Sequence, residues 1–465
     1  MVFTTMIFIV LFLPITTAIY FLIPEKKIAL RNALLLIVSV IFYSWGEPIN
    51  LILLLLSIGI TYTLSFGIAD KNKGMLIFAI AANMFPLAVF KYLDFFIINI
   101  NQAFHLHLGL THLALPIGIS FYTFQILTYI IDLYKGKVSL QKNPAYLALY
   151  VFLFPQLIAG PIVRYSDVER EISSRHSTWQ GIYEGVRRFV LGMIKKMIFA
   201  NQAGYVVSRI QSNAESSTAL MWVAVISYGV QILFDFSGYS DMAIGLGKIY
   251  GFSFPENFNR PYISQSVTEF WRRWHMTLSG FFRDYVYIPM GGNRVSSLRR
   301  IFNLFTVWFL TGLWHGASWN FIFWGLYYFV LLILEKYVWG GALKHCKKWF
   351  QKLTTLFFIM LGWGIFMTET NSLSEFGKFL RNLFGFYNPV STAGVRALGI
   401  QSALIITALG LILSISTVPQ FTVRFYRRHE MGMRIAEAVV LIPLFVVCVL
   451  MIAGASFNPF IYFRF

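Results

Sequence analysis

The chain has 465 residues, of which 57% are hydrophobic and only 12% are charged, and its mean hydropathy is +0.65. This composition leaves too little polar surface for a soluble domain, so we expect a protein solvated by membrane lipid. The net charge of +18 does not indicate a nucleic-acid partner, because the basic residues lie in short loops between apolar runs and form no continuous basic domain.

Apolar runs long enough to cross a bilayer recur along nearly the whole chain. Because one helical crossing needs about 20 apolar residues, we expect a single all-α membrane domain over 1–465, with about 11–12 transmembrane helices and a few short or re-entrant helices. The expected spans are 4–22, 30–46, 50–68, 75–92, 113–133, 188–208, 219–236, 302–316, 319–336, 353–368, 398–420 and 435–456.

One further apolar stretch, 145–163, is interrupted by Pro155, Gly160 and Pro161. Irregular backbone at membrane depth is tolerated only where protein or a water-filled cavity satisfies its polar groups. We therefore expect a broken or re-entrant segment near a substrate cavity.

Basic residues are concentrated in alternate loops, namely 26–31, 71–73, 135–142, 336–352 and 421–434. Loops rich in lysine and arginine remain on the cytoplasmic side of a membrane. This alternation predicts that both chain termini lie outside the cytoplasm.

The most distinctive chemical feature is TGLWHGASWNFIFWG at 311–325, which places His315 in an apolar, tryptophan-rich run. Intramembrane ionisable groups are often functional, and an imidazole can take a proton from an attacking hydroxyl near neutral pH. The alternative is a histidine that holds two helices together through a hydrogen bond.

The second feature is WRRWHMTLSGFFRDYVYIPMGGNR at 271–294. If this segment is one helix, Trp271, Trp274, His275 and Leu278 share a face. The segment then either lies in the membrane interface, or places His275 beside His315 in one cavity. In the second case the basic side chains attract donor phosphates, and these are Arg272, Arg273, Arg283 and Arg294. The paired glycines of GGNR predict a tight turn.

Two acidic residues, Asp235 and Asp241, lie in an apolar run just before this basic segment. Six residues apart, they do not share a helical face and make a poor acid/base pair. We expect them to pair with basic residues of 251–300 or to orient a histidine.

No metal site is predicted, since no cluster of histidine, cysteine and carboxylate side chains has the spacing of metal ligands. Phosphate-binding loops and serine-hydrolase motifs are also absent from the sequence.

With WRRWH at 271–275 and LWHG at 313–316, the chain resembles the membrane-bound O-acyltransferase family. Within it, the sequence is most similar to the bacterial alginate O-acetylation branch. This similarity rests on PIGISFYTFQILTYIIDLYKGKV at 116–138, FPQLIAGPIVRYSD at 154–167, FDFSGYSDMAIG at 234–245, PENFNRPY at 255–262, FFRDYVYIPMGGNR at 281–294 and NPFIYFRF at 458–465.

The resemblance implies a polytopic helical fold around a central funnel or tunnel, in the bacterial inner membrane. It implies that His315 is the catalytic histidine and His275 the other motif histidine, with Trp274 and Trp314 beside them in the substrate site. Acetyl-CoA is the implied acyl donor, and no tightly bound cofactor is expected. The implied partners are membrane lipid, a periplasmic or extracellular acetyltransferase and a polysaccharide acceptor.

Two other functions remain open at this point. D-alanyl transfer to teichoic acid would depend on a carrier protein in place of CoA. A non-enzymatic carrier or flippase for polysaccharide would survive the loss of His315. The acceptor is equally open, because alginate, cellulose, peptidoglycan and other wall polymers are all compatible with the sequence.

Overall fold

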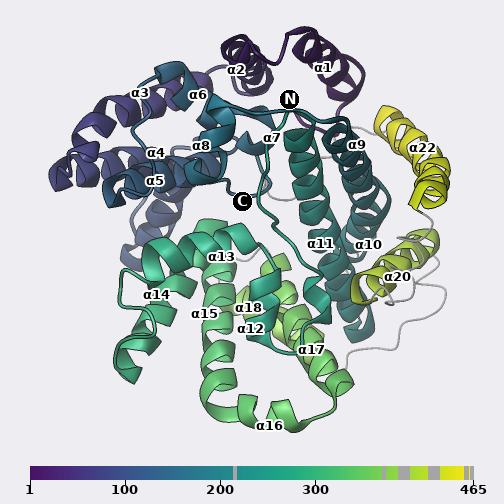
Figure 1. Ribbon diagram of the computed structural model, residues 1–465. Helices are drawn as coiled ribbons and strands as arrows, with labels where there is room; N and C mark the ends of the chain where they lie inside the picture. Colours follow the sequence, from purple (N-terminus) through teal and green to yellow (C-terminus); the bar gives the residue numbers. More distant parts are fainter. Residues whose placement is uncertain (213–216, 369–372, 386–397, 417–429, 455–459, 461–465) are drawn as a thin grey trace. The chain divides into compact units, whose positions relative to one another are not determined.

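The computed structural model describes residues 1–212, 217–368, 373–385, 398–416, 430–454 and 460. Within these ranges the chain forms helices joined by short loops and contains no strand (Figure 1). The prediction of an all-α fold is confirmed. The central funnel implied by the family resemblance stays a prediction.

Contacts between residues divide the chain into two compact units. The first unit comprises 1–189, 240–256 and 455–465, and the second comprises 190–239 and 257–454. Two long helices, α9 (Trp179–Ile194) and α11 (Thr218–Ile249), contribute residues to both units. The prediction of a single membrane domain over 1–465 is not tested by this division, because neither unit is one continuous stretch of chain.

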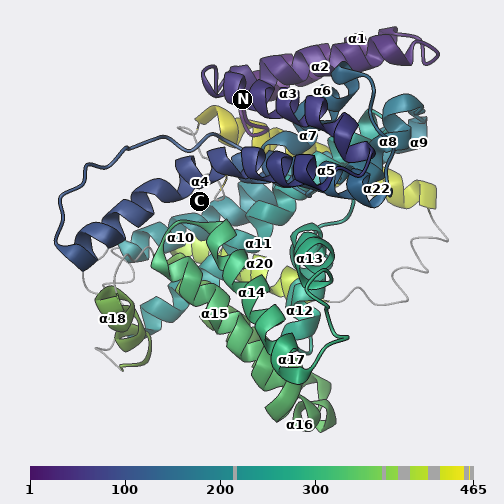
Figure 2. The same ribbon diagram turned by 90° about the vertical axis from the view of Figure 1, so that its left-hand side faces the viewer.

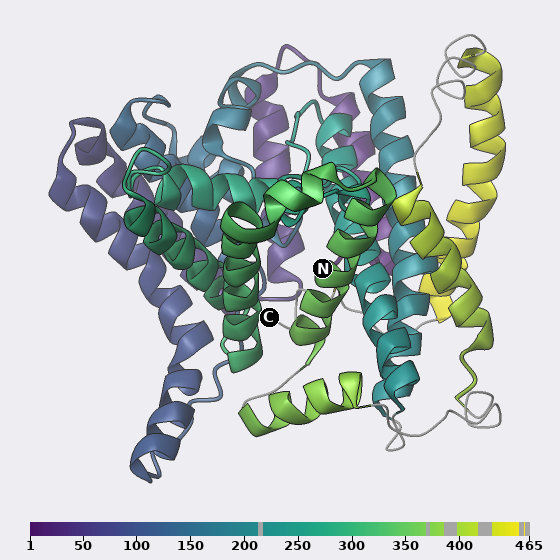
Figure 3. The same cartoon turned by 90° about the horizontal axis from the view of Figure 1, so that it is seen from below.

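The first unit is built around the packed helices α3, α4 and α5. Figure 2 shows these three helices side by side, and Figure 3 shows the C-terminal part of α4 extending away from them. Every residue of α5 from Ile119 to Ile130 is buried. The elements of this unit are η1 (Phe8–Phe12), α1 (Leu13–Leu22), α2 (Ile28–Ser44), α3 (Asn50–Ala69), α4 (Lys73–Phe104), α5 (Ile119–Lys135), α6 (Pro144–Phe152), α7 (Phe154–Leu157) and α8 (Tyr165–Ser173).

The second unit carries both sequence motifs. Its elements are η2 (Lys195–Ala200), α10 (Asn201–Gln211), η3 (Pro261–Ile263), α12 (Val267–Arg273), α13 (Met276–Phe282), η4 (Arg283–Tyr287), α14 (Ser297–His315), α15 (Trp319–Leu334), η5 (Glu335–Trp339), α16 (Gly340–His345), α17 (Lys348–Met367), α18 (Leu373–Phe384), α20 (Gln401–Ile415) and α22 (Glu430–Gly454). The segments η2, η4 and η5 are π-helical turns that continue neighbouring α-helices.

Six helices in the described ranges are long and apolar enough to cross a membrane. They are Asn50–Ala69, Lys73–Phe104, Thr218–Ile249, Trp319–His345, Lys348–Met367 and Gly432–Gly454. Three shorter apolar helices are Phe8–Leu22, Ile28–Ser44 and Gln401–Ile415. These helices confirm a polytopic membrane fold. Six of the twelve expected spans correspond to the long apolar helices, and 4–22, 30–46 and 398–420 correspond to the shorter ones. The expected spans 113–133, 188–208 and 302–316 appear in neither set.

The broken character of 145–163 is confirmed. Helix α6 ends at Phe152, Leu153 leaves the helical region, and the four-residue helix α7 follows. The whole stretch from Leu149 to Val163 is buried, so the irregular backbone lies inside protein. The segment 421–429 and the terminal NPFIYFRF, apart from Phe460, lie outside the described residues.

Candidate functional site

The WRRWH motif does not continue as one helix. Helix α12 ends at Arg273, Trp274 is extended, and His275 adopts a left-handed conformation with φ of 43° before α13 begins at Met276. The expectation that Trp271, Trp274, His275 and Leu278 share one helical face is therefore wrong. A non-glycine residue at positive φ is uncommon and costs conformational energy, so surrounding contacts must maintain it.

These contacts come from Asn257, which is completely buried. Its backbone carbonyl accepts a hydrogen bond from the Met276 N–H at 2.9 Å. Its side-chain Oδ1 lies 3.1 Å from Nδ1 of His275 and accepts a bond from the Thr277 hydroxyl at 2.9 Å. The helix break thus replaces helical hydrogen bonds with bonds to the 257–259 segment, and it fixes the His275 ring.

His275 is 1% exposed and is surrounded by aromatic rings. The ring of Phe236 packs edge-on at a centroid distance of 4.6 Å, and Trp314 packs edge-on at 5.7 Å. Burial away from water lowers the pKa of His275 to about 3, because it penalises the charged imidazolium. His275 is therefore a neutral imidazole at physiological pH.

His315 is the last residue of α14 and is 3% exposed. Its ring makes edge-on contacts with Trp314, Trp324 and Phe366, at centroid distances of 5.0, 4.9 and 5.1 Å. Because Trp314 contacts both imidazoles, the structure brings the two motif histidines into one shared aromatic cluster.

Close packing of α14 against α15 holds His315 in this cluster. A Cβ on Gly312 would lie 2.5 Å from the carbonyl oxygen of Phe321, and one on Gly325 would lie 2.4 Å from that of Trp308. Any larger residue at either position would push the two helices apart. These glycines therefore set the distance between the helix that ends in His315 and the helix that supplies Trp324.

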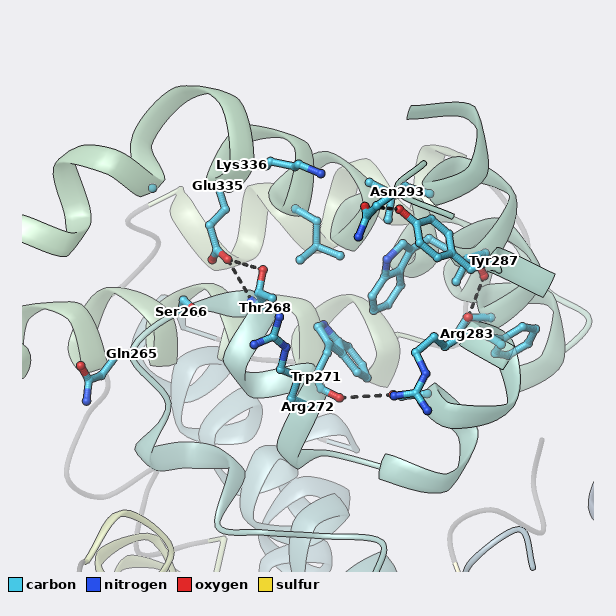
Figure 4. Close-up of a pocket in the computed structure, with 18 of the residues that line it drawn as sticks. Gln265, Ser266, Thr268, Trp271, Arg272, Arg283, Tyr287, Asn293, Glu335 and Lys336 are labelled. Atoms are coloured by element: carbon cyan, nitrogen blue, oxygen red, sulfur yellow. Dashed lines mark hydrogen bonds between the residues drawn. The ribbon is translucent and has the colours of Figure 1, made fainter. Parts of the chain in front are cut away.

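A cavity of about 730 Å³ opens beside this cluster, within the second unit. Its volume lies within the range of about 300–1,000 Å³ that is typical of small-molecule sites. Figure 4 shows Glu335 and Lys336 on one side and Arg283 and Tyr287 on the other, with α12 between them. His275, Trp271 and Arg272 line this cavity, whereas His315 is not among its lining residues in the described chain. Of the two motif histidines, His275 therefore borders this cavity.

The four arginines expected to attract phosphate are placed differently. Arg294 is exposed and is not among the residues that line the cavity in the described chain. Arg272 is exposed and lines the cavity. Arg283 also lines it and forms an ion pair with Asp284 at 2.7 Å. Arg273 is not among the lining residues; it forms an ion pair with Glu269 at 2.8 Å and donates to the carbonyl of Asn259. The geometry therefore favours Arg272 and Arg283 over Arg273 as ligand-binding residues.

The two motif tryptophans are both buried. Trp274 stacks on Phe270 at 5.6 Å and contacts Trp363 at 4.7 Å, and it does not line the cavity in the described chain. Trp314 contacts both histidines, as described above. Trp274 is thus placed as a packing residue, whereas Trp314 is placed at the site.

The two aspartates form separate ion pairs. Asp235 is 1% exposed and lies 2.5 Å from the ammonium of Lys196 in η2. Asp241 belongs to the first unit and pairs with Arg188 of α9 at 2.9 Å, and Arg188 also binds Glu256. These partners lie outside the basic part of 251–300, where we expected them, because the turn of α11 that carries Asp235 faces η2 and the turn that carries Asp241 faces α9.

Sequence reasoning missed Asn257, Glu335 and Lys196. Glu335 accepts hydrogen bonds from the backbone N–H groups of Val267 and Thr268 and thereby anchors the start of α12. A polar residue between aromatic residues, as in FPENFNRPY, could have indicated Asn257. Nothing in the local sequence distinguishes Lys196 from Lys195, since only their packing differs.

The predicted tight turn at GGNR is confirmed, with φ of 101° at Gly291 and 56° at Gly292.

Residues 133–374 match the sequence profile of MBOAT, the membrane-bound O-acyltransferase family, and this match covers more than half of the chain. The chain belongs to this family. As a family member it is an O-acyltransferase and a multi-pass membrane protein. The resemblance drawn from WRRWH and LWHG is confirmed.

Named relatives narrow the comparison within the family. The Pseudomonas aeruginosa protein named "Probable alginate O-acetylase AlgI" is 40% identical over 382 residues, which cover 79% of this chain and 72% of the relative. The peptidoglycan O-acetyltransferase of Helicobacter pylori is 34% identical over 83% of this chain and 80% of its own length. The teichoic acid D-alanyltransferase of Bacillus subtilis is 28% identical over 54% of this chain and 68% of its own length.

Proposed function

We propose that this acyltransferase passes an acetyl group from a cytoplasmic thioester, acetyl-CoA, across the bacterial inner membrane for O-acetylation of a cell-surface polysaccharide. The observation that carries the proposal is the extent of the similarity to O-acetylating relatives, which covers 79% and 83% of this chain in the two cases reported. The similarity to the D-alanyltransferase covers only 54% and is weaker.

His315 takes the part of the general base in this proposal. A hydroxyl oxygen of the acceptor attacks the thioester carbonyl, the imidazole removes the hydroxyl proton, the C–S bond breaks, and the thiol leaves with a proton. The edge-on contacts with Trp314, Trp324 and Phe366 restrict the ring and keep bulk water away. A base held in place in this way contributes about 10² to 10⁴-fold to the rate.

The remaining parts of the proposal concern the two faces of the membrane. The family resemblance implies that the thioester enters from the cytoplasm, and the basic loops predict that both termini lie outside it. An extracytoplasmic acetyltransferase partner supplies the acceptor hydroxyl for this step, receives the acetyl group and completes its transfer to sugar hydroxyls. Membrane lipid is the solvent of the apolar helices, and the acceptor polymer is an extracytoplasmic polysaccharide.

The test compares surface polysaccharide from cells that carry the wild-type protein, His315→Ala or His315→Gln. An amide can keep a hydrogen bond but cannot act as a base near neutral pH. We expect both variants to accumulate normally and to lose polymer acetylation. Near wild-type acetylation in His315→Gln would make His315 a packing residue. Release of D-alanine in place of acetate from wild-type polymer would assign the chain to D-alanyl transfer.

A further inference from the structure

We propose that Asn257 holds His275 as a hydrogen-bond acceptor for an amide of the pantetheine arm of the acyl donor. In this role His275 binds and orients the thioester and takes no proton from the acceptor hydroxyl. The inference rests on the proposed function, since it concerns the donor of that reaction. It assigns a task to the histidine that lines the cavity and a positioning role to Asn257.

The orientation of the Asn257 amide is settled by its neighbour. The backbone N–H of Thr277 can only donate, and it points at the Oδ1 atom of Asn257 at 3.4 Å. The atom facing the His275 ring is therefore an oxygen, which only accepts. It follows that Nδ1 of His275, 3.1 Å away, carries the proton and donates it.

A neutral imidazole with its proton on Nδ1 has a lone pair on Nε2. This nitrogen is buried and has no hydrogen-bond partner among the described residues. Because His275 lines the cavity and Nδ1 is occupied by Asn257, Nε2 is the ring atom left for a ligand there. A buried acceptor without a partner is costly, which makes a ligand that donates to it favourable.

The low pKa of His275 supports the same role. Burial lowers this pKa to about 3, so the ring does not gain a second proton at neutral pH and Nε2 stays an acceptor. A weakly basic imidazole is a poor general base, whereas it remains a competent hydrogen-bond acceptor.

A complementary donor lines the same cavity. The Nε1–H of Trp271, which also lines the cavity, has no hydrogen-bond acceptor in the part of the chain that the structure describes. A ligand that fits this cavity must offer a donor to His275 and an acceptor to Trp271. A secondary amide offers both in one rigid group.

The other residues that line the cavity indicate which amide-containing ligand would fit. The lining combines apolar side chains, including Leu278, Leu304 and Val307, with the cations of Arg272, Lys336 and Lys344. A pantetheine arm is a flexible chain with two amides and a hydroxyl, a thioester at one end and a phosphate at the other. Coenzyme A and an acyl carrier protein both present this arm, so the cavity recognises the chemistry that they share.

Two isosteric substitutions separate this role from proton transfer. His275→Asn keeps an amide near the position of Nδ1, where it can still bind Asn257, and removes the acceptor at the position of Nε2. Asparagine also tolerates the left-handed backbone of this position. His275→Gln places an amide oxygen near Nε2. His176→Asn, at an exposed histidine that pairs with Glu25 in the first unit, is the matched control.

The measurement is equilibrium binding of S-acetylpantetheine, the arm alone, and of acetyl-CoA to the full chain in lipid nanodiscs. We expect His275→Asn to weaken both by about threefold to tenfold, the loss typical of one neutral hydrogen bond. His275→Gln should recover most of the lost affinity, and His176→Asn should match wild type. In single-turnover acetyl release, His275→Asn should raise the donor concentration needed for the half-maximal rate by about the factor by which it weakens binding, and it should lower the rate at saturating donor by about tenfold or less.

Unchanged binding in His275→Asn, or a rate loss of about 10² to 10⁴-fold at saturating donor in both His275 variants, overturns the inference and makes His275 a base or a purely structural residue. A wild-type protein that acetylates polymer while binding no S-acetylpantetheine refutes the arm site alone. A wild-type protein that neither binds the arm nor acetylates polymer refutes the proposed function as well. If an acylated carrier protein binds and acetyl-CoA does not, the arm site stands with the carrier as its source.

Discussion

Substitutions in the buried ion pair between Lys196 and Asp235 test whether Asp235 stabilises the fold or takes part in the reaction. The two side chains are 5% and 2% exposed, and Nζ lies 2.5 Å from the carboxylate. Removing one charge of a buried pair costs about 3–5 kcal/mol, because the remaining charge stays in a medium that solvates it poorly. Asp235→Asn should therefore lower the free energy of unfolding by about 3–5 kcal/mol.

The companion variant replaces both charges. Lys196→Met with Asp235→Leu removes the pair and substitutes apolar side chains of similar size, next to an apolar cluster that includes Phe234. Such exchanges are often neutral or stabilising. We expect the double variant to recover most of the loss. In a cycle with the single variants Lys196→Met and Asp235→Leu, the coupling energy should therefore exceed the loss that either single change causes.

Asp241→Asn is the matched control on the same helix. Its partner Arg188 retains a second carboxylate from Glu256, and the Arg188 and Asp241 side chains are 22% and 16% exposed. A loss of about 1 kcal/mol or less is expected. Stability is measured by denaturant unfolding in one detergent, beside polymer acetylation in cells. If Asp235→Asn unfolds like wild type yet abolishes acetylation, Asp235 acts in the reaction and the structural interpretation is refuted.

Three further predictions follow from the placement of charged groups. Arg272→Glu should raise the KM for acetyl-CoA by about tenfold, since a charge-assisted contact is lost, whereas Arg273→Gln should change it little; equal effects would contradict the cavity assignment. Because burial lowers the pKa of His275 from 6.5 to about 3, only the unfolded chain binds a proton between these values, so unfolding free energy should fall as pH falls. The wild type should lose about 2 kcal/mol relative to His275→Asn between pH 7 and pH 5 in urea titrations, and parallel curves would contradict this. Reporters fused after residues 72, 140 and 345 should be cytoplasmic and one at the C-terminus external; opposite labelling at two sites would overturn the orientation.

Much of the fold could be predicted because hydrophobic runs determine membrane helices directly. The expected spans at 50–68 and 353–368 correspond to α3 and α17 within a few residues. Helices that combine apolar and polar stretches were harder. Helix α4 continues to Phe104, well past the expected end at residue 92, and α11 runs through both aspartates to Ile249. In both helices, polar residues beyond the expected end of the span form hydrogen bonds or ion pairs within the protein, so the helix continues through them.

The sequence singled out the two motif histidines, and the structure places both against Trp314, but the sequence did not predict the local geometry of the motifs. The motif around His275 has good helical spacing, and no local signal indicates the break after Arg273. That break is imposed by the 257–259 segment, whose Asn259 N–H binds the carbonyl of Arg273 and whose Asn257 binds residues 275–277. Such pairing between segments depends on tertiary packing, which single-sequence periodicity does not contain.

The left-handed backbone at His275 also restricts which amino acids the position can accept. Residues that tolerate positive φ are few, chiefly glycine, asparagine, aspartate and histidine. A saturation library at this codon, selected only for protein that inserts and accumulates, should therefore be enriched in these four residues before any selection for activity. Among them, histidine alone carries an acceptor as far from the backbone as Nε2. At codon 275 a folding requirement and a chemical requirement thus overlap in a single amino acid.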